Sequence, residues 1–378
     1  MNIKRTAKII IAALFILNFG VCAYAVNTDD YYKDPLEASG ADKLSESLSP
    51  QAREFLEKLG CEDIEFEKIL DVSPKTVFKL LAETVKDGIK APLKGMTAAA
   101  GAVILISVCA GFFPDDDKSK TVLNTVCGCF LVISVFVPAA NSVRAAASAI
   151  GMCAAFEKAL IPVLAALAAV GGNPALALSV RGAALAAAEF IEAFSQSFAL
   201  PLVGASGALG VTGAMLPTLR LSAVSEVIRK TLLWSLSSAA ALFSGFLTLK
   251  GILSSAADSL TAKGVKLAAN TFVPVVGGAI GEAYSSVTGS LSLLRSTVGI
   301  YAVAAFFAIG IPVIINLALW TLAMRLACAV SDLLDCRQCS EILKNTAFVF
   351  SMINTLLLLC MVVFIISAGI IALIKTGE

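Results

Sequence analysis

The stretch Thr271-Phe-Val-Pro-Val-Val-Gly-Gly-Ala-Ile-Gly-Glu-Ala-Tyr284 is apolar enough to lie in a membrane. Pro274, Gly277 and Gly278 interrupt it, so we expect a helix that stops and restarts there. In lipid, such a break is tolerated only where protein or a water-filled cavity satisfies the freed backbone groups. The stretch therefore predicts a bundle of other helices around it. Beyond the break, an apolar stripe follows the helical period, and Glu282 lies on another face.

The composition of the whole chain indicates that enough apolar helices are present to form such a bundle. Of the 378 residues, 58% are hydrophobic and 15% are charged, whereas soluble domains are about 25% charged. Several apolar runs reach about 18 residues, the length that a transmembrane helix needs. We therefore predict an all-α, polytopic membrane helix bundle with Pro/Gly-broken helices.

Composition also excludes several classes of function. With a net charge of +1, the chain lacks the excess of basic residues that is typical of nucleic-acid-binding proteins. The chain has no histidine, which removes Ser-His and Cys-His nucleophile pairs and histidine metal sites. It also has no phosphate-binding loop of the Walker type, so any energy source is another protein or a gradient. We expect no catalytic, cofactor-binding or metal-binding residues.

Residues 1–25 are typical of a signal peptide, with a positive start, an apolar core and a small-x-small site at Ala23-Tyr24-Ala25. We expect cleavage after Ala25. A lipoprotein signal with Cys22 as the lipidated residue fits less well, because Val21 is bulky. An uncleaved first helix is the other alternative.

Residues 26–93 form a polar segment that the signal peptide places outside the cytoplasm. Its acidic first part, residues 27–47, is expected to be mobile. Ser49-Pro50 and Ser73-Pro74 each predict the start of a helix, a cap residue followed by proline. The second helix is amphipathic and rich in lysine. It either lies on a membrane or docks a partner, or it packs on its own neighbours.

Residues 94–378 form the membrane domain, with six to eight crossings. The first two, residues 96–113 and 121–140, make a hairpin with a charged turn. Residues 141–158 are Ala-rich and are interpreted as an interfacial helix. Residues 325–345 are interpreted as a polar loop.

A second set of helix breakers lies at Pro162, Gly171 and Gly172, and it echoes the set at Pro274, Gly277 and Gly278. Two discontinuous segments in corresponding places are typical of a transporter built from repeats. Because the two sets differ in spacing, the echo is weak support for a true repeat.

Glu189, Glu192 and Glu282 are the carboxylates of greatest interest. At membrane depth a charge costs a few kcal/mol, so it is usually paired or faces a cavity. One hypothesis is that the three line a conduit or substrate pocket near the broken backbone. The other is that their segments lie in the interface, where the carboxylates reach headgroup water.

The ten cysteines lie mostly in apolar segments and do not form a disulfide framework. Cys336-Arg337-Gln338-Cys339 is the one motif-like pair, and it indicates either redox or metal chemistry or incidental spacing. With eight crossings after a cleaved signal, this pair is cytoplasmic and reduced. With one crossing fewer, it lies outside and is oxidised.

The order of these pieces resembles the stage III sporulation protein AE family of endospore-forming bacteria. The resemblance rests on the signal peptide, the short helical segment and the hairpin. It rests most specifically on Ile-Pro-Val-Leu-Ala-Ala-Leu-Ala-Ala-Val-Gly-Gly at 161–172 and Phe-Val-Pro-Val-Val-Gly-Gly at 272–278. It covers essentially the whole chain.

The resemblance implies a non-enzymatic membrane subunit of the sporulation channel that joins mother cell and forespore after engulfment. It implies as partners the stage III membrane proteins AA to AH, an ATPase among them, and a protein of the forespore membrane. The implied location is the mother-cell-derived outer forespore membrane. The alternative is a stand-alone secondary transporter with its site at the broken helices. An intramembrane enzyme fits less well, because the chain has no intramembrane Asp pair.

Overall fold

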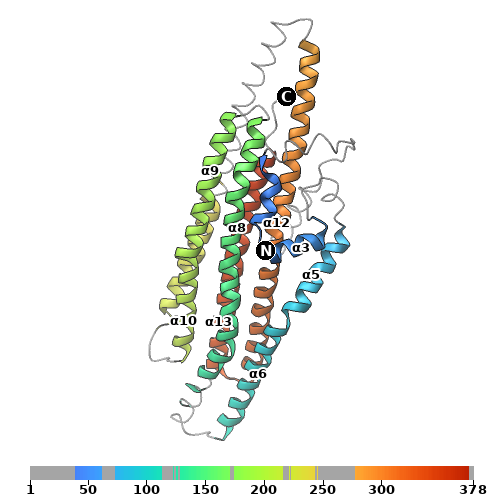
Figure 1. The fold of residues 1–378 in the computed structure, drawn as a ribbon. Coiled ribbons are helices and arrows are strands. Elements are labelled where there is room, and N and C mark those ends of the chain that lie inside the picture. The colour runs from blue at the N-terminus through green and yellow to red at the C-terminus, as the bar shows by residue number, and fades with distance from the viewer. Residues whose placement is uncertain are drawn as a thin grey trace, which may run out of the picture.

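The computed structural model describes residues 39–61, 73–112, 122, 125–126, 128–170, 174–215, 221, 223–242, 245 and 277–373. Every regular element in this part of the chain is a helix. The long helices lie side by side in one elongated bundle, with short N-terminal helices against its side (Figure 1). The predicted all-α membrane bundle is confirmed. The predicted signal peptide lies outside the described residues.

The N-terminal helices α3 (Pro50–Leu59) and α5 (Pro74–Gly88) begin where the sequence predicts them. The Ser49 side chain accepts a hydrogen bond from the Ala52 N–H at 3.2 Å, and the Ser73 side chain accepts one from the Lys75 N–H at 3.3 Å. Each bond satisfies one of the amides that a helix start leaves without a partner.

The N-terminal segment docks on the bundle. The 3-10 helix η1 (Ala41–Ser47) packs on α8 (Val137–Val170), and α3 packs on α12 (Gly277–Leu333). Ala41 and Leu44 are buried. The expectation of mobility is therefore wrong for residues 41–47, because apolar side chains at helical spacing anchor them.

The bundle contains α6 (Lys90–Gly111), α8, α9 (Pro174–Ala193), α10 (Leu200–Met215), α12 and α13 (Arg337–Leu373). A further helix covers residues 223–242. The expected hairpin is present: α6 is followed by helical residues 128–131, the π-helix η2 (Val132–Phe136) and α8. Residues 141–158 belong to α8 and do not form a separate interfacial helix, because their small side chains allow burial of Ala146, Ala149 and Ala154.

Proline has two different effects in these helices. The π-helices η2 and η3 (Phe194–Ala199) end two residues before Pro138 and Pro201, respectively. Proline lacks an N–H and clashes with the carbonyl four residues back, and a wider turn relieves both problems. At Pro162, however, α8 continues, and at Pro312 α12 continues. The helix break expected at Pro162 is therefore wrong.

Among the other predicted breakers, Gly277 and Gly278 lie in the first turn of α12, and the rest lie outside the described residues. Helix α8 ends at Val170 and α9 begins at Pro174, so Gly171 and Gly172 fall between them, outside the described residues. Helix α12 begins at Gly277, and Pro274 also lies outside the described part.

The polar loop expected at residues 325–345 is also wrong. Helix α12 extends to Leu333 and α13 begins at Arg337, so only a tight turn joins them. The polar residues of this region lie instead on exposed faces of the two helix ends, as Glu341 and Lys344 do, with Nζ and Oε1 3.8 Å apart.

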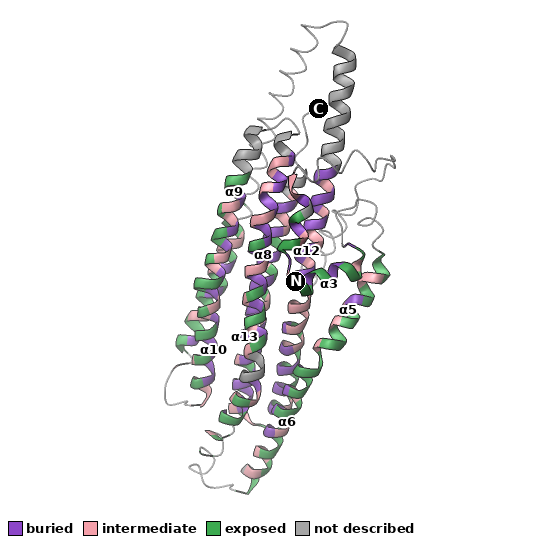
Figure 2. Ribbon diagram, in the orientation of Figure 1, coloured by how far each residue is buried: buried purple, intermediate pink, exposed green. Residues whose placement is uncertain are grey.

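The core is centred on the antiparallel pair α12 and α13, which packs along most of its length (Figure 1). Trp320 stacks on Phe350 at 5.6 Å between ring centroids, and Phe306 stacks on Phe364 at 5.6 Å. Phe156 of α8 meets Phe306 edge to face at 5.3 Å. Buried residues line the inner faces of the helices, whereas the outer faces are exposed (Figure 2).

Among the described residues, five helical segments are long and apolar enough to cross a membrane. They are 90–109, 140–167, 184–215, 294–333 and 337–369. The segment in α12 has 40 residues, and its uncharged run from Ser296 to Met324 is about 44 Å long at 1.5 Å per residue. A hydrocarbon core is only about 30 Å thick. Helix α12 is therefore strongly tilted, or part of its apolar length lies beyond the lipid against other protein.

Helix α5 leaves much of its apolar side uncovered. Phe78 is 73% exposed, and Val85 and Ile89 are also exposed, whereas Leu80 is its one buried residue. Lys79 and Lys86 lie beside this stripe and are also exposed. Packing on neighbouring helices therefore covers only the Leu80 side of α5. The apolar stripe that stays uncovered favours a contact with a membrane or a partner.

The orientation of the N-terminal segment can be tested on α3. Glu57 is exposed on α3, whereas Cys61 is 2% exposed, and burial raises the pKa of the Cys61 thiol. We expect a membrane-impermeant maleimide to label a Glu57→Cys variant in intact protoplasts within minutes and the native chain far more slowly, because the thiolate is the reacting form. Labelling of Glu57→Cys only after lysis would place this segment in the cytoplasm.

Candidate functional site

Lys158 of α8 forms ion pairs with two carboxylates on α9. Its Nζ lies 2.9 Å from Glu189 Oε1 and 2.7 Å from Glu192 Oε2. The connection between α8 and α9 is short, so the helices pack side by side (Figure 1). Glu189 and Glu192 are three residues apart and therefore lie on one face of α9. We call Lys158, Glu189 and Glu192 the charge cluster.

The charge cluster lies on the outside of the bundle. The Glu189 side chain is 68% exposed, and those of Lys158 and Glu192 are 33% and 32% exposed. Both helices are apolar enough here to cross a membrane. The cluster carries one positive and two negative charges. Lipid is a poor neighbour for such a surface, because charged side chains inside a membrane are usually paired or face water or protein.

The structure therefore changes the interpretation of the predicted carboxylates. Glu189 and Glu192 are brought together and are paired with Lys158, a residue whose role the sequence alone did not reveal. A signal was present: Lys158 is the one cation between Arg144 and Arg181, and an isolated charge in an apolar helix usually has a partner. Glu282 lies in the first turns of α12, and its side chain is outside the described set.

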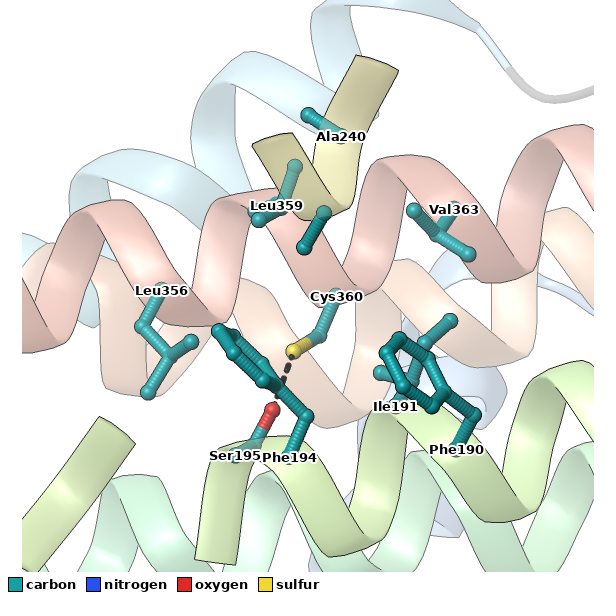
Figure 3. Close-up of a pocket in the computed structure, with 10 residues that line it drawn as sticks. Phe190, Ile191, Phe194, Ser195, Ala240, Leu356, Leu359, Cys360 and Val363 are labelled. Carbon is teal, nitrogen blue, oxygen red and sulfur yellow. Dashed lines mark hydrogen bonds between the residues drawn. The ribbon is translucent and has the colours of Figure 1, made fainter. Parts of the chain in front are cut away.

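A small apolar pocket of about 20 Å³ lies beside the charge cluster. Phe190, Phe194 and Phe198 form a ladder along α9 and η3, with ring centroids 6.1 and 5.5 Å apart. The first two rings line the pocket opposite Leu359 and Val363 of α13, and Ala240 closes another side (Figure 3). This lining is apolar, and the space that it encloses is about enough for one water molecule.

The polar atoms of the pocket come from Ser195 and Cys360, whose Oγ and Sγ are 3.2 Å apart (Figure 3). Neither has a histidine to act as base, because the chain has none. In the described part of the chain, no group of three or more Cys, Asp or Glu side chains is placed to hold a metal ion. The other side chains that line the pocket are apolar.

Glu157, the neighbour of Lys158, points into the bundle, and the sequence pattern did not single it out. It is 1% exposed, and neither carboxyl oxygen makes a hydrogen bond of good geometry within the described part of the chain. Ser367 of α13 lies near it. An unpaired charge at this depth would cost several kcal/mol, so the neutral acid is the form that fits.

Arg295 of α12 is also fully buried. Its guanidinium Nη2 donates a hydrogen bond to the Leu167 carbonyl oxygen at 3.3 Å. Leu167 belongs to α8, so this bond joins α8 to α12.

Together, the long apolar helices and the exposed charge cluster define a multi-pass α-helical membrane protein with a polar surface on its spanning segments. The chain belongs to the stage III sporulation protein AE family, whose sequence profile matches residues 53–375. The predicted family is thus confirmed.

One curated relative is the Stage III sporulation protein AE of Bacillus subtilis (strain 168). It is 24% identical over 231 residues, which cover 60% of this chain and 57% of that protein. No solved structure matches the chain significantly.

Proposed function

We propose that the chain is a non-enzymatic membrane subunit of a sporulation-specific, secretion-like channel complex that links mother cell and forespore and is needed for forespore development after engulfment. The family supports a role in sporulation. The observation that carries the proposal of a complex is the charge cluster, because charges exposed on spanning helices need a polar neighbour.

Two further observations support a multi-subunit assembly. The apolar part of α12 is longer than the hydrocarbon core of a bilayer is thick. In an assembly, other protein subunits can cover the apolar side chains that extend beyond the lipid. The uncovered stripe on α5 offers a second contact area. The proposed partners are the other stage III membrane proteins AA to AH, including the ATPase, and a protein of the forespore membrane, with this chain in the outer forespore membrane.

The second candidate is a stand-alone secondary transporter. Glu157 favours it, because a buried carboxyl in a membrane bundle is typical of ion-coupled transport. The continuity of α8 through Pro162 and the apolar lining of the pocket weigh against it.

Affinity capture separates the two candidates. A tagged chain is isolated at engulfment after mild crosslinking, and the co-purified proteins are identified by mass spectrometry, with an unrelated tagged multi-pass protein as control. We expect the other stage III membrane proteins and the ATPase to be enriched over the control. Recovery of the chain alone, as a monomer or homo-oligomer, would contradict the channel proposal and favour the transporter.

A further inference from the structure

Two thiols meet at the turn between α12 and α13. Cys336 is the last residue before α13, and Cys339 lies in the first turn of that helix. The Cys336 thiol donates to the Cys339 sulfur, with the two Sγ atoms 2.7 Å apart. A disulfide bond is about 2.05 Å long, so the two sulfur atoms would have to come about 0.65 Å closer to form one.

The turn itself holds this geometry. The Ser331 hydroxyl donates to the Cys336 carbonyl oxygen at 2.9 Å, and the Cys336 N–H donates to the Ser331 carbonyl oxygen at 3.0 Å. Asp335 adopts a left-handed backbone conformation, with φ 53°, that reverses the chain before α13. The position of Cys336 at the helix start is therefore fixed by hydrogen bonds at both of its backbone polar groups.

The two thiols differ in access. Cys336 is partly exposed, whereas Cys339 is fully buried. A reagent from solution therefore reaches Cys336 first, and Cys339 is placed to attack the Cys336 sulfur afterwards. This division between an entry thiol and a resolving thiol is the arrangement that thiol–disulfide exchange requires.

We propose that Cys336 and Cys339 form a reversible redox site that exchanges with an oxidant carrying a disulfide. In the first step, the Cys336 sulfur attacks the oxidant's disulfide, forms a mixed disulfide and releases one thiol. In the second step, Cys339 attacks Cys336 Sγ, which closes the internal disulfide and releases the second thiol. Two electrons and the two thiol protons pass to the oxidant.

A structural crosslink and a metal site both fit this pair of cysteines less well. A bridge across two intervening residues closes a very short loop, so it constrains the unfolded chain little and is a weak structural crosslink. A metal site of three or more ligands would need a further Cys, Asp or Glu side chain beside the pair. None is placed there among the residues that the structure describes.

The surroundings of Cys336 set the rate of exchange. The hydrogen bond to Cys339 and then burial raise the pKa of the Cys336 thiol. The thiolate is the attacking species, so oxidation is slow at neutral pH and becomes faster as the pH rises. Because the exchange is slow, only prolonged exposure to the oxidant converts the pair to the disulfide.

The test uses the purified full-length chain in lipid nanodiscs. The protein is equilibrated with excess glutathione disulfide, quenched with acid and alkylated, and the peptide containing residues 336–339 is examined by mass spectrometry. We expect this peptide to lose both alkylation sites together, by forming an internal disulfide, and to regain both after dithiothreitol.

Three variants sharpen the test. Cys336→Ser and Cys339→Ser each abolish the internal disulfide. The matched control, Cys328→Ser, removes a nearby buried thiol that contacts Ser340 and leaves oxidation of the pair unchanged. Retention of both alkylation sites in folded native protein after prolonged exposure to the oxidant would overturn the proposal. Equal oxidation of Cys336 and Cys339 to separate mixed disulfides would also overturn it.

Discussion

A Lys158→Glu variant is expected to lose most of its heat-resistant spores. The substitution places a third carboxylate beside Glu189 and Glu192, where the native Nζ lies within 3 Å of both partners. The variant leaves three carboxylates and no cation at these positions, and unpaired charges on spanning helices are unfavourable in a membrane. The measurement is the count of heat-resistant spores in a strain that depends on this chain, together with the amount of protein in the membrane.

Charge exchange provides the control for this variant. Adding Glu189→Lys to Lys158→Glu restores one cation and two carboxylates at the same three positions. We expect the double variant to recover at least about tenfold in spore count, since the favourable pairing is re-formed. Normal sporulation of the single Lys158→Glu variant would show that the charge cluster has no role.

A Gly95→Ala variant is expected to lower the stability of the bundle by about 1–3 kcal/mol, the usual cost of overpacking a core. A Cβ atom at Gly95 would lie 2.6 Å from one ring atom of Trp320 and 2.9 Å from another. Trp320 is fully buried and stacked on Phe350, so its ring has no room to move. The measurement is the midpoint of thermal unfolding in detergent.

Gly101 provides the matched control, since it lies on the same helix, α6, and a Cβ there would meet nothing within 4 Å. We expect Gly101→Ala to be neutral or stabilising by about 0.5–1 kcal/mol, because alanine favours a helix more than glycine does. Equal midpoints for the two variants would contradict the close packing of α6 on α12.

Local signals in the sequence predicted local structure well. Ser49-Pro50 and Ser73-Pro74 marked the starts of α3 and α5, because a cap depends on residues within one turn. Length and hydrophobicity predicted the all-helical bundle, since spanning helices satisfy their own backbone groups.

The predictions that were wrong depended on packing between helices, which the periodicity of the sequence does not describe. Pro162 was expected to break a helix, but α8 continues because neighbouring helices support its backbone. The polar residues 325–345 were expected to form a loop, yet they occupy exposed faces at two helix ends. The pairing of Lys158 with Glu189 and Glu192 joins residues more than thirty positions apart, which requires knowledge of how α8 and α9 pack.

The most direct test of the proposed channel subunit asks what covers the charge cluster in the cell. A photoreactive amino acid is placed at Ala193, which is exposed on α9 one turn after Glu189, and in a second variant at Leu105, an exposed apolar position on α6. Sporulating cells are irradiated, and the adducts are identified by mass spectrometry. We expect position 193 to crosslink to another stage III membrane protein and position 105 to lipid. Lipid adducts alone at position 193 would contradict the proposal that a protein partner covers the cluster.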